Sequence, residues 1–411
     1  MRDTFRALAG RDFRLYFSGQ SISLIGTWVQ QVAFSWIAYH LTGSAFMLGL
    51  IAFCGQVPTL LLSPLGGMVA DHYNKRAVLI VIQFLQMTVA ATLALLVWRD
   101  AVAPWHLVAA SLAVGLTGAI ELPVRLAFTP SIVHDARNLP NAIALNSVTF
   151  NAARLVGPAA AGFIMAAFGE TVCFAINALS YVPTIYTLAA IHPDRGEPRG
   201  RTGPLRESID YLRTFAPARW LLIIVLVASF CLAPYLTFMP VYAKDMMQGG
   251  PETLGMLMSA SGLGALGAGI YLANRKSVVG LGDRIVGACF AAALASVAFA
   301  YNTVLWVALP LLVVTGSATI IIVTSCNIVL QSLVPDRLRG RVMAFYSMGF
   351  VGMMPLSSLL AGSAANMVGV RPVFVVAGAA FATIGFALKR RLLELRQEAL
   401  PVLREKGLVP K

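Results

Sequence analysis

Long apolar runs separated by short polar segments dominate this chain. A helix needs about 20 mostly apolar residues to cross the hydrocarbon core of a membrane, and these runs have that length. We therefore predict an all-α membrane protein with twelve transmembrane helices. The first six are expected at residues 13–40, 44–70, 77–98, 105–129, 141–167 and 171–191, and the second six at 219–243, 253–273, 284–300, 304–331, 341–367 and 371–388.

Composition agrees with a lipid environment, because 58% of the residues are hydrophobic and only 12% are charged. The formal net charge of +13 could indicate nucleic-acid binding, but the basic residues lie between apolar runs and not on a soluble basic face. The five cysteines fall inside the apolar runs without a CxxC spacing, which argues against a disulfide framework or a zinc site. We expect no metal, no cofactor and no nucleic acid.

The basic residues also predict the orientation, since Lys and Arg concentrate in short loops on the cytoplasmic side. If the amino terminus is cytoplasmic, all but four of the 31 Lys and Arg residues fall in cytoplasmic segments. We therefore expect an inner-membrane, multi-pass protein with both termini in the cytoplasm. The four exceptions are Arg99, Arg154, Lys244 and Arg371.

The longest polar stretch divides the chain into two sets of six helices. It is rich in Pro, Gly and Arg, and within it Leu205, Ile209, Leu212 and Phe215 recur at helical spacing, which indicates a short amphipathic helix at the membrane surface. That helix could be a simple tether or could have a regulatory role. The predicted domains are an amino-terminal bundle (1–191), a cytoplasmic linker (192–218), a carboxy-terminal bundle (219–390) and a cytoplasmic tail (391–411).

An internal repeat supports two related halves. A constant offset of 200 residues, without gaps, aligns both loops and helices of the two halves. We therefore expect two pseudo-symmetric six-helix bundles. The matches are Gly67, Asn74, Lys75 and Arg76 with Gly267, Asn274, Arg275 and Lys276, and Gly162, Gly169 and Phe174 with Gly362, Gly369 and Phe374.

The loop after the second predicted helix reads GGMVADHYNKR, from Gly66 to Arg76. It resembles the G-x-x-x-D-x-x-x-[RK]-[RK] signature loop of the major facilitator superfamily. In that superfamily the acidic residue braces the cytoplasmic ends of the two halves, so the resemblance implies a conformational latch and not a substrate ligand. The latch residues would be Gly67, Asp71, Lys75 and Arg76. In the second half Tyr271 stands where Asp71 would repeat, so latching is expected to be asymmetric.

Further motifs are similar to those of the drug and siderophore exporter branch, which includes enterobactin exporters and macrolide efflux proteins. They are the segments SLIGTW (23–28), LTGS (41–44), PVR (123–125) and RLVGP (154–158). Gly157, Pro158 and Gly162 also partly match the G-P-x-x-G-G antiporter motif of helix five, although the glycine comes one position late and is not doubled. The resemblance covers essentially the whole chain and implies export.

Charged side chains inside a membrane are costly, so each one is a functional candidate. In the first half Glu121 and Arg154 lie deep, and Arg125 follows Glu121 at the i,i+4 spacing. A carboxylate paired with arginine keeps its charge, whereas one alone in a desolvated cavity binds a proton near neutral pH. We hypothesise that Glu121, with Arg125 or Arg154 as its partner, couples transport to protons. The alternative is a permanent clamp between helices four and five.

The first predicted helix carries polar residues on one face: Gln20, Ser23, Thr27, Gln30 and Gln31. A polar face in lipid has to meet a cavity or another helix, and helix one lines the central cavity in the superfamily that this chain resembles. Bulky aromatic residues would suit a partly apolar substrate. The expected cavity residues are Thr27, Gln30, Gln31, Phe34, Tyr235, Phe238, Asn327 and Gln331.

The predicted function is a secondary active transporter, expected to be a proton-coupled exporter of a small amphiphilic molecule that works as a monomer in contact with membrane lipid. An importer, a facilitator, a lysolipid transporter and a non-transporting receptor or scaffold remain alternatives. An enzyme is not expected, because the five histidines lie near helix ends and no HExxH, GxSxG, P-loop or GxGxxG motif accompanies them.

Overall fold

The computed structural model describes residues 2–133, 135–191, 205–275 and 277–406, and its described part is helical without strands. The chain divides into two compact units. The first contains the described residues up to 191 together with 240–259, and the second contains 205–239 and 260–406. Residues 192–204 of the predicted linker, 407–411 of the predicted tail and the repeat residue Lys276 lie outside the described residues.

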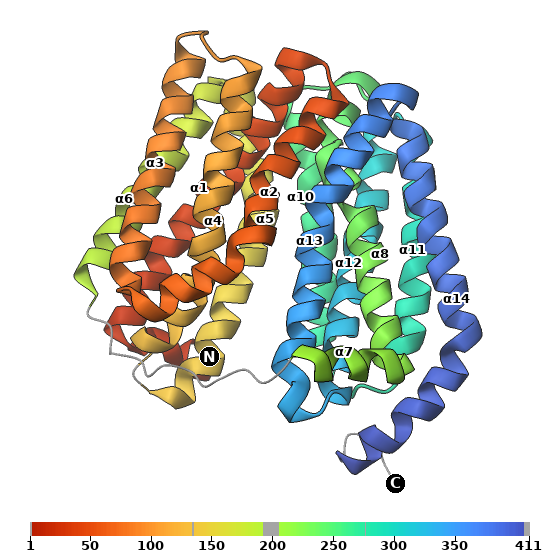
Figure 1. The fold of residues 1–411 in the computed structure, drawn as a ribbon. Coiled ribbons are helices and arrows are strands. Elements are labelled where there is room, and N and C mark those ends of the chain that lie inside the picture. Colours follow the sequence, from red (N-terminus) through yellow and green to blue (C-terminus); the bar gives the residue numbers. More distant parts are fainter. Residues whose placement is uncertain (1, 134, 192–204, 276, 407–411) are drawn as a thin grey trace. The chain divides into compact units, whose positions relative to one another are not determined.

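The first unit is a helical bundle (Figure 1). Ser44 and Asn74 begin α2 and α3, because their side-chain oxygens accept hydrogen bonds from the backbone N–H groups of Met47 and Ala77. Its elements are η1 (Arg2–Ala9), α1 (Arg11–Thr42), α2 (Ala45–His72), α3 (Lys75–Trp98), α4 (Pro104–Ile132), η2 (Ala136–Asn138), α5 (Leu139–Phe168) and α6 (Glu170–Ala190), joined by α9 (Met239–Val241), the π-helical η3 (Tyr242–Met246) and the start of α10 (Pro251–Ala273).

The second unit repeats this plan. α8 packs on α13 as α1 packs on α5, and α11 packs on α14 as α3 packs on α6. The turns that join the last two helices of each half sit at Gly169 (φ 80°) and Gly369 (φ 83°), 200 residues apart, in a conformation that favours glycine. The elements are α7 (Leu205–Thr214), α8 (Ala216–Thr237), the rest of α10, α11 (Leu281–Tyr301), α12 (Leu305–Leu333), α13 (Asp336–Val368) and α14 (Val370–Glu405).

Twelve long helices follow the predicted order, so the all-α membrane fold with two pseudo-symmetric bundles is confirmed. Among the described residues, eleven helices are long and apolar enough to span a membrane by composition alone. α1 is not among the eleven, because its polar face makes it less apolar than the others, but its 32 residues exceed the length of a span. Large apolar side chains such as Trp306 and Leu294, 76% and 74% exposed, are suited to lipid contact.

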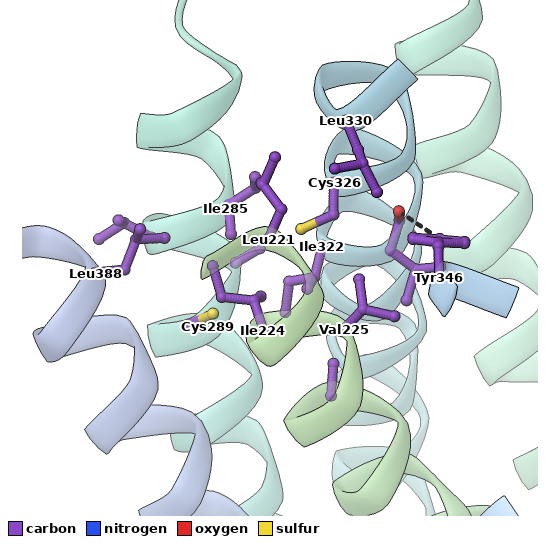
Figure 2. Close-up of a cluster of buried hydrophobic side chains, with 14 of the residues drawn as sticks. Leu221, Ile224, Val225, Ile285, Cys289, Ile322, Cys326, Leu330, Tyr346 and Leu388 are labelled. Carbon is purple, nitrogen blue, oxygen red and sulfur yellow. Dashed lines mark hydrogen bonds between the residues drawn. The ribbon is translucent and has the colours of Figure 1, made fainter. Parts of the chain in front are cut away.

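The core of the second unit is a layer of aliphatic side chains from α8, α11, α12, α13 and α14 (Figure 2). Cys289 and Cys326 pack within it as small apolar residues. The Tyr346 hydroxyl satisfies its hydrogen-bonding capacity by donating to the carbonyl oxygen of Val323, 2.9 Å away. The bundle is therefore held together mainly by packing, and this buried hydroxyl is bonded internally.

Two segments outside the predicted spans also pack on this unit: the short helix α7 and the end of α14. α7 lies in the predicted amphipathic segment, where Tyr211, Leu212 and Phe215 pack against the core, and burial raises the pKa of Tyr211 to about 12. The apolar run of the last span ends near Leu388, as predicted, but α14 itself continues to Glu405 (Figure 1). It continues because the residues after 388 still alternate with helical period and pack their apolar face on the bundle.

Candidate functional site

Glu121 lies on α4 within a cluster of polar side chains, and its own side chain is only 14% exposed. Gln86 of α3 donates from Nε2 to Oε2 of Glu121 at 2.8 Å, and Gln83 donates from Nε2 to Oε1 at 3.4 Å. Arg125, one turn along α4, forms an ion pair with Oε1 at 3.5 Å. Two amide groups and one guanidinium therefore stabilise the negative charge of this carboxylate inside the bundle.

The two glutamines reach Glu121 because they are three residues apart on the face of α3 that packs against α4. Both are buried, at 3% and 9% exposure, and Gln86 also donates to the hydroxyl of Thr117 at 3.2 Å. Among the described residues Oε1 of Gln83 has no hydrogen-bond partner. The amide of Gln83 therefore has unused capacity to accept a hydrogen bond beside Glu121.

A cavity of about 370 Å³ adjoins this cluster in the first unit, between α1, α4 and α5. Its wall includes Tyr16 and Gln20 of α1, Arg125 of α4, and Asn146 and Asn151 of α5. The remaining wall is largely apolar, as in many sites that bind small molecules. Arg125 therefore belongs to both features. Its guanidinium pairs with Glu121, and the residue also lines the cavity.

Of the two predicted cationic partners, the structure brings Arg125 to Glu121. Arg154 is half-buried on α5. Gln83 and Gln86 were not among the predicted site residues, although two glutamines at i,i+3 spacing inside an apolar run were a detectable signal.

The polar face of α1 divides between two surroundings. Gln20 lines the cavity, whereas Gln30 accepts a hydrogen bond from Asn177 of α6 at 2.8 Å. Thr27 and Gln31 are exposed. The division arises because Gly26 lets α1 approach α6 closely, where a Cβ would lie 2.8 Å from Oδ1 of Asn177. Helix packing thus accounts for part of this polar face.

The other predicted cavity residues lie in separate surroundings. Tyr235 and Phe238 are 3% and 0% exposed inside the second unit, and the Tyr235 ring packs on Phe299 with centroids 5.9 Å apart. Gln331 donates to Asn327 on the same helix at 2.7 Å. In the first unit Phe34 is half-buried, with its ring 6.5 Å from that of Phe174.

The helix-five motif forms close helix contacts within the first unit. A Cβ on Gly157 would collide with Trp28 of α1. A Cβ on Gly162 would lie 2.8 Å from the carbonyl oxygen of Pro251, and one on Gly255 would lie 2.6 Å from that of Pro158. Small residues at these positions therefore let α5 pack directly on α1 and on the start of α10.

The predicted latch residues lie on both sides of the turn between α2 and α3, with Gly67 and Asp71 in the last turns of α2 and Lys75 and Arg76 at the start of α3. Asp71 is exposed, Lys75 begins α3, and Arg76 donates to the carbonyl oxygen of Ala189 at the end of α6, 2.6 Å away. A Cβ on Gly67 would meet no atom within 4 Å. Packing within the first unit therefore does not explain Gly67, and its role as part of a latch remains a prediction.

At the other end of the first unit, α1 meets η3. The Tyr39 hydroxyl donates to the carboxylate of Asp245, and the Lys244 ammonium lies 5.7 Å from the centre of the Tyr39 ring. Tyr39 is only 5% exposed, whereas Asp245 is exposed, so the hydrogen bond is partly open to solvent. This contact ties the end of α1 to a π-helical turn, a type of distortion that is frequent at functional sites.

Comparison with known proteins agrees with this fold. A family model described as transmembrane secretion effector, of the major facilitator type, matches residues 3–404. A staphyloferrin A transporter of Staphylococcus aureus is 27% identical over 397 residues, covering 94% of this chain and 98% of the relative. A multidrug efflux pump Tap of Mycolicibacterium fortuitum is 25% identical over 402 residues, covering 94% and 95%.

Solved structures show the same fold at low identity. A bacterial homologue of the human lysosomal transporter Spinster, inward-facing and occupied, has a TM-score of 0.71 at 14% identity, covering 93% of this chain and 97% of that one. A bacterial homologue of the iron transporter ferroportin, inward-facing, has a TM-score of 0.69 at 17% identity, covering 92% and 98%. The chain is a multi-pass membrane transporter and not an enzyme, and it belongs to the transmembrane secretion effector family of the major facilitator superfamily.

Proposed function

We propose that this protein exports a small amphiphilic molecule in exchange for protons, by alternating access, in the inner membrane with both termini in the cytoplasm. The observation that carries this proposal is the shared position of Arg125 between the Glu121 carboxylate and the cavity wall. Efflux and siderophore transporters among the relatives support the direction of transport. The excess of Lys and Arg in alternate loops supports the orientation.

Coupling requires that substrate affinity differ between the two protonation states of Glu121. When Glu121 is ionised, its charge balances that of Arg125, and the two glutamine amides hold the carboxylate. A proton on Glu121 removes the negative charge and leaves Arg125 uncompensated at the cavity wall. The electrostatic potential of the cavity therefore becomes more positive on protonation.

The direction in which the cavity potential changes on protonation limits the charge that the substrate can carry. In proton antiport the substrate has to bind better when Glu121 is ionised and leave when it is protonated. A wall that turns more positive on protonation weakens the binding of a cationic amphiphile and strengthens that of an anionic one. We therefore propose a cationic amphiphile as the exported substrate.

The test uses the purified protein in liposomes with ethidium as a cationic amphiphilic probe. A pH difference should drive accumulation of ethidium against its concentration gradient in the wild type. Glu121→Gln should abolish uphill accumulation while keeping downhill exchange, because the cavity remains but cannot exchange a proton. Glu170→Gln, at the first turn of α6 and outside the cluster, serves as the matched control. Uphill accumulation by Glu121→Gln would show that Glu121 has only a structural role.

A further inference from the structure

The second unit contains a cavity of about 160 Å³ that is separate from the region discussed above. It lies between the first turns of α8 and α11, the last turns of α12 and the extension of α14 beyond residue 388. Its lining is almost entirely aliphatic, and includes Leu221, Ile224, Leu333, Leu392 and Leu403. Such a lining favours an apolar ligand.

The cavity lies at the level where the apolar part of the bundle gives way to charged sequence. The apolar run of α14 ends at Leu388, and Lys389, Arg390 and Arg391 follow directly. Trp220, at the first turn of α8, is half-buried and lines the cavity. Tryptophan and basic residues together mark the boundary between hydrocarbon and water. The cavity is therefore accessible at the depth of lipid headgroups and upper acyl chains.

Two arginines lie beside the cavity, but only one is neutralised. Arg396 lines the cavity and forms an ion pair with Asp283 at 2.7 Å. The Arg391 guanidinium instead lies 5.5 Å from the centre of the Trp220 ring, and no carboxylate lies within ion-pair distance of it in the described part of the chain. A guanidinium that stacks on a ring keeps its edge N–H groups free to donate, and their fork geometry matches a phosphate.

We propose that this cavity binds an acyl chain of an anionic phospholipid whose phosphate group contacts Arg391. The apolar lining accounts for the chain, and the uncompensated cation at the mouth accounts for the anionic headgroup. The bound lipid connects the α14 extension to α8 and α11. This site does not depend on the direction of transport or on Glu121.

Arg390 provides a matched control for Arg391. Both are exposed, adjacent on α14 and stacked on an aromatic ring, but the ring under Arg390 belongs to Phe386, which does not line the cavity. The delipidated full-length protein is titrated with phosphatidylglycerol or phosphatidylcholine, and binding is followed by native mass spectrometry. We expect Arg391→Gln to weaken phosphatidylglycerol binding about fivefold, the effect of one cation near an anionic lipid. Arg390→Gln should leave binding unchanged.

A second variant tests the acyl-chain part. Ala399→Leu adds volume to the cavity wall and should weaken binding of both lipids, whereas Ala387→Leu, which lies on α14 outside the cavity, should not. Equal binding by Arg391→Gln and the wild type, or equal losses from Arg390→Gln and Arg391→Gln, would overturn the proposal. Complete displacement of the lipid by soluble glycerol phosphate would also overturn it, since that would show a phosphate site without a chain.

Discussion

Gln86 donates its side-chain amide to the carboxylate of Glu121 across the α3–α4 interface, with 2.8 Å between Nε2 and Oε2. The same amide donates to Thr117, so it ties one turn of α4 to α3 at two points. Because Gln86 is buried, water does not replace these bonds when they are lost. The stability of the interface and the charge on Glu121 are therefore linked.

We predict that Gln86→Met lowers the free energy of unfolding by about 2 kcal/mol, the range for a buried hydrogen bond to a charged group. Methionine keeps the length of the side chain but provides no donor. Thermal unfolding in detergent measures the change. Gln56→Met is the control, because within the described part of the chain the Gln56 amide bonds only to the carbonyl oxygen of Ala52 in its own helix. Equal losses in the two variants would contradict the assignment.

The adjacent glycines of the signature loop give a second prediction. A Cβ on Gly66 would collide with the carbonyl oxygen of Ala119 and lie 2.6 Å from Cγ of Pro123, whereas one on Gly67 would meet nothing within 4 Å. Gly66→Ala should therefore destabilise the protein by about 1 to 3 kcal/mol through overpacking of α2 on α4. Gly67→Ala should raise stability slightly in thermal unfolding, because alanine is the better helix former and its Cβ meets no atom. If Gly67 belongs to a latch, it should still slow transport, and normal transport would contradict that role.

Much of this architecture could be predicted from sequence, because lipid imposes length and composition on each span. The pair of Glu121 and Arg125 was also accessible, since both lie on one helix at i,i+4 spacing. Gln83 and Gln86 were not identified, because their role depends on which face of α3 meets α4. For the same reason, sequence could not show that the polar face of α1 divides between the cavity and Asn177.

The attachment of α7 gives a third prediction. Glu207 forms ion pairs with Arg337 and with Arg341, the latter at 3.5 Å, at the start of α13. Because Glu207 is 38% exposed and Arg337 is 71% exposed, solvent screens this attraction. Glu207→Gln should cost less than about 1 kcal/mol, and salt should reduce the effect further. Thermal unfolding at low and high salt measures it, with Glu394→Gln as an exposed control. A larger loss would mean that α7 is held mainly by this charge.

The contact between Tyr39 and Asp245 gives a fourth prediction. Tyr39→Phe removes the donor from a carboxylate that is itself exposed to solvent, so we expect a loss of about 0.5 to 1.5 kcal/mol in the free energy of unfolding. Tyr186→Phe, on an exposed tyrosine of α6, should change nothing. Unchanged unfolding of Tyr39→Phe would show that the hydrogen bond does not contribute to stability.

The most direct measurement of the central claim is proton release on substrate binding. Ethidium is added to the purified protein in weakly buffered detergent solution, and a pH indicator records the protons released. If Glu121 is the coupling carboxylate, the wild type and Glu170→Gln should release protons on binding. Glu121→Gln, which resembles the protonated state, should bind ethidium more weakly and, at saturating ethidium, should release none. Proton release by Glu121→Gln equal to that of the wild type would contradict the account.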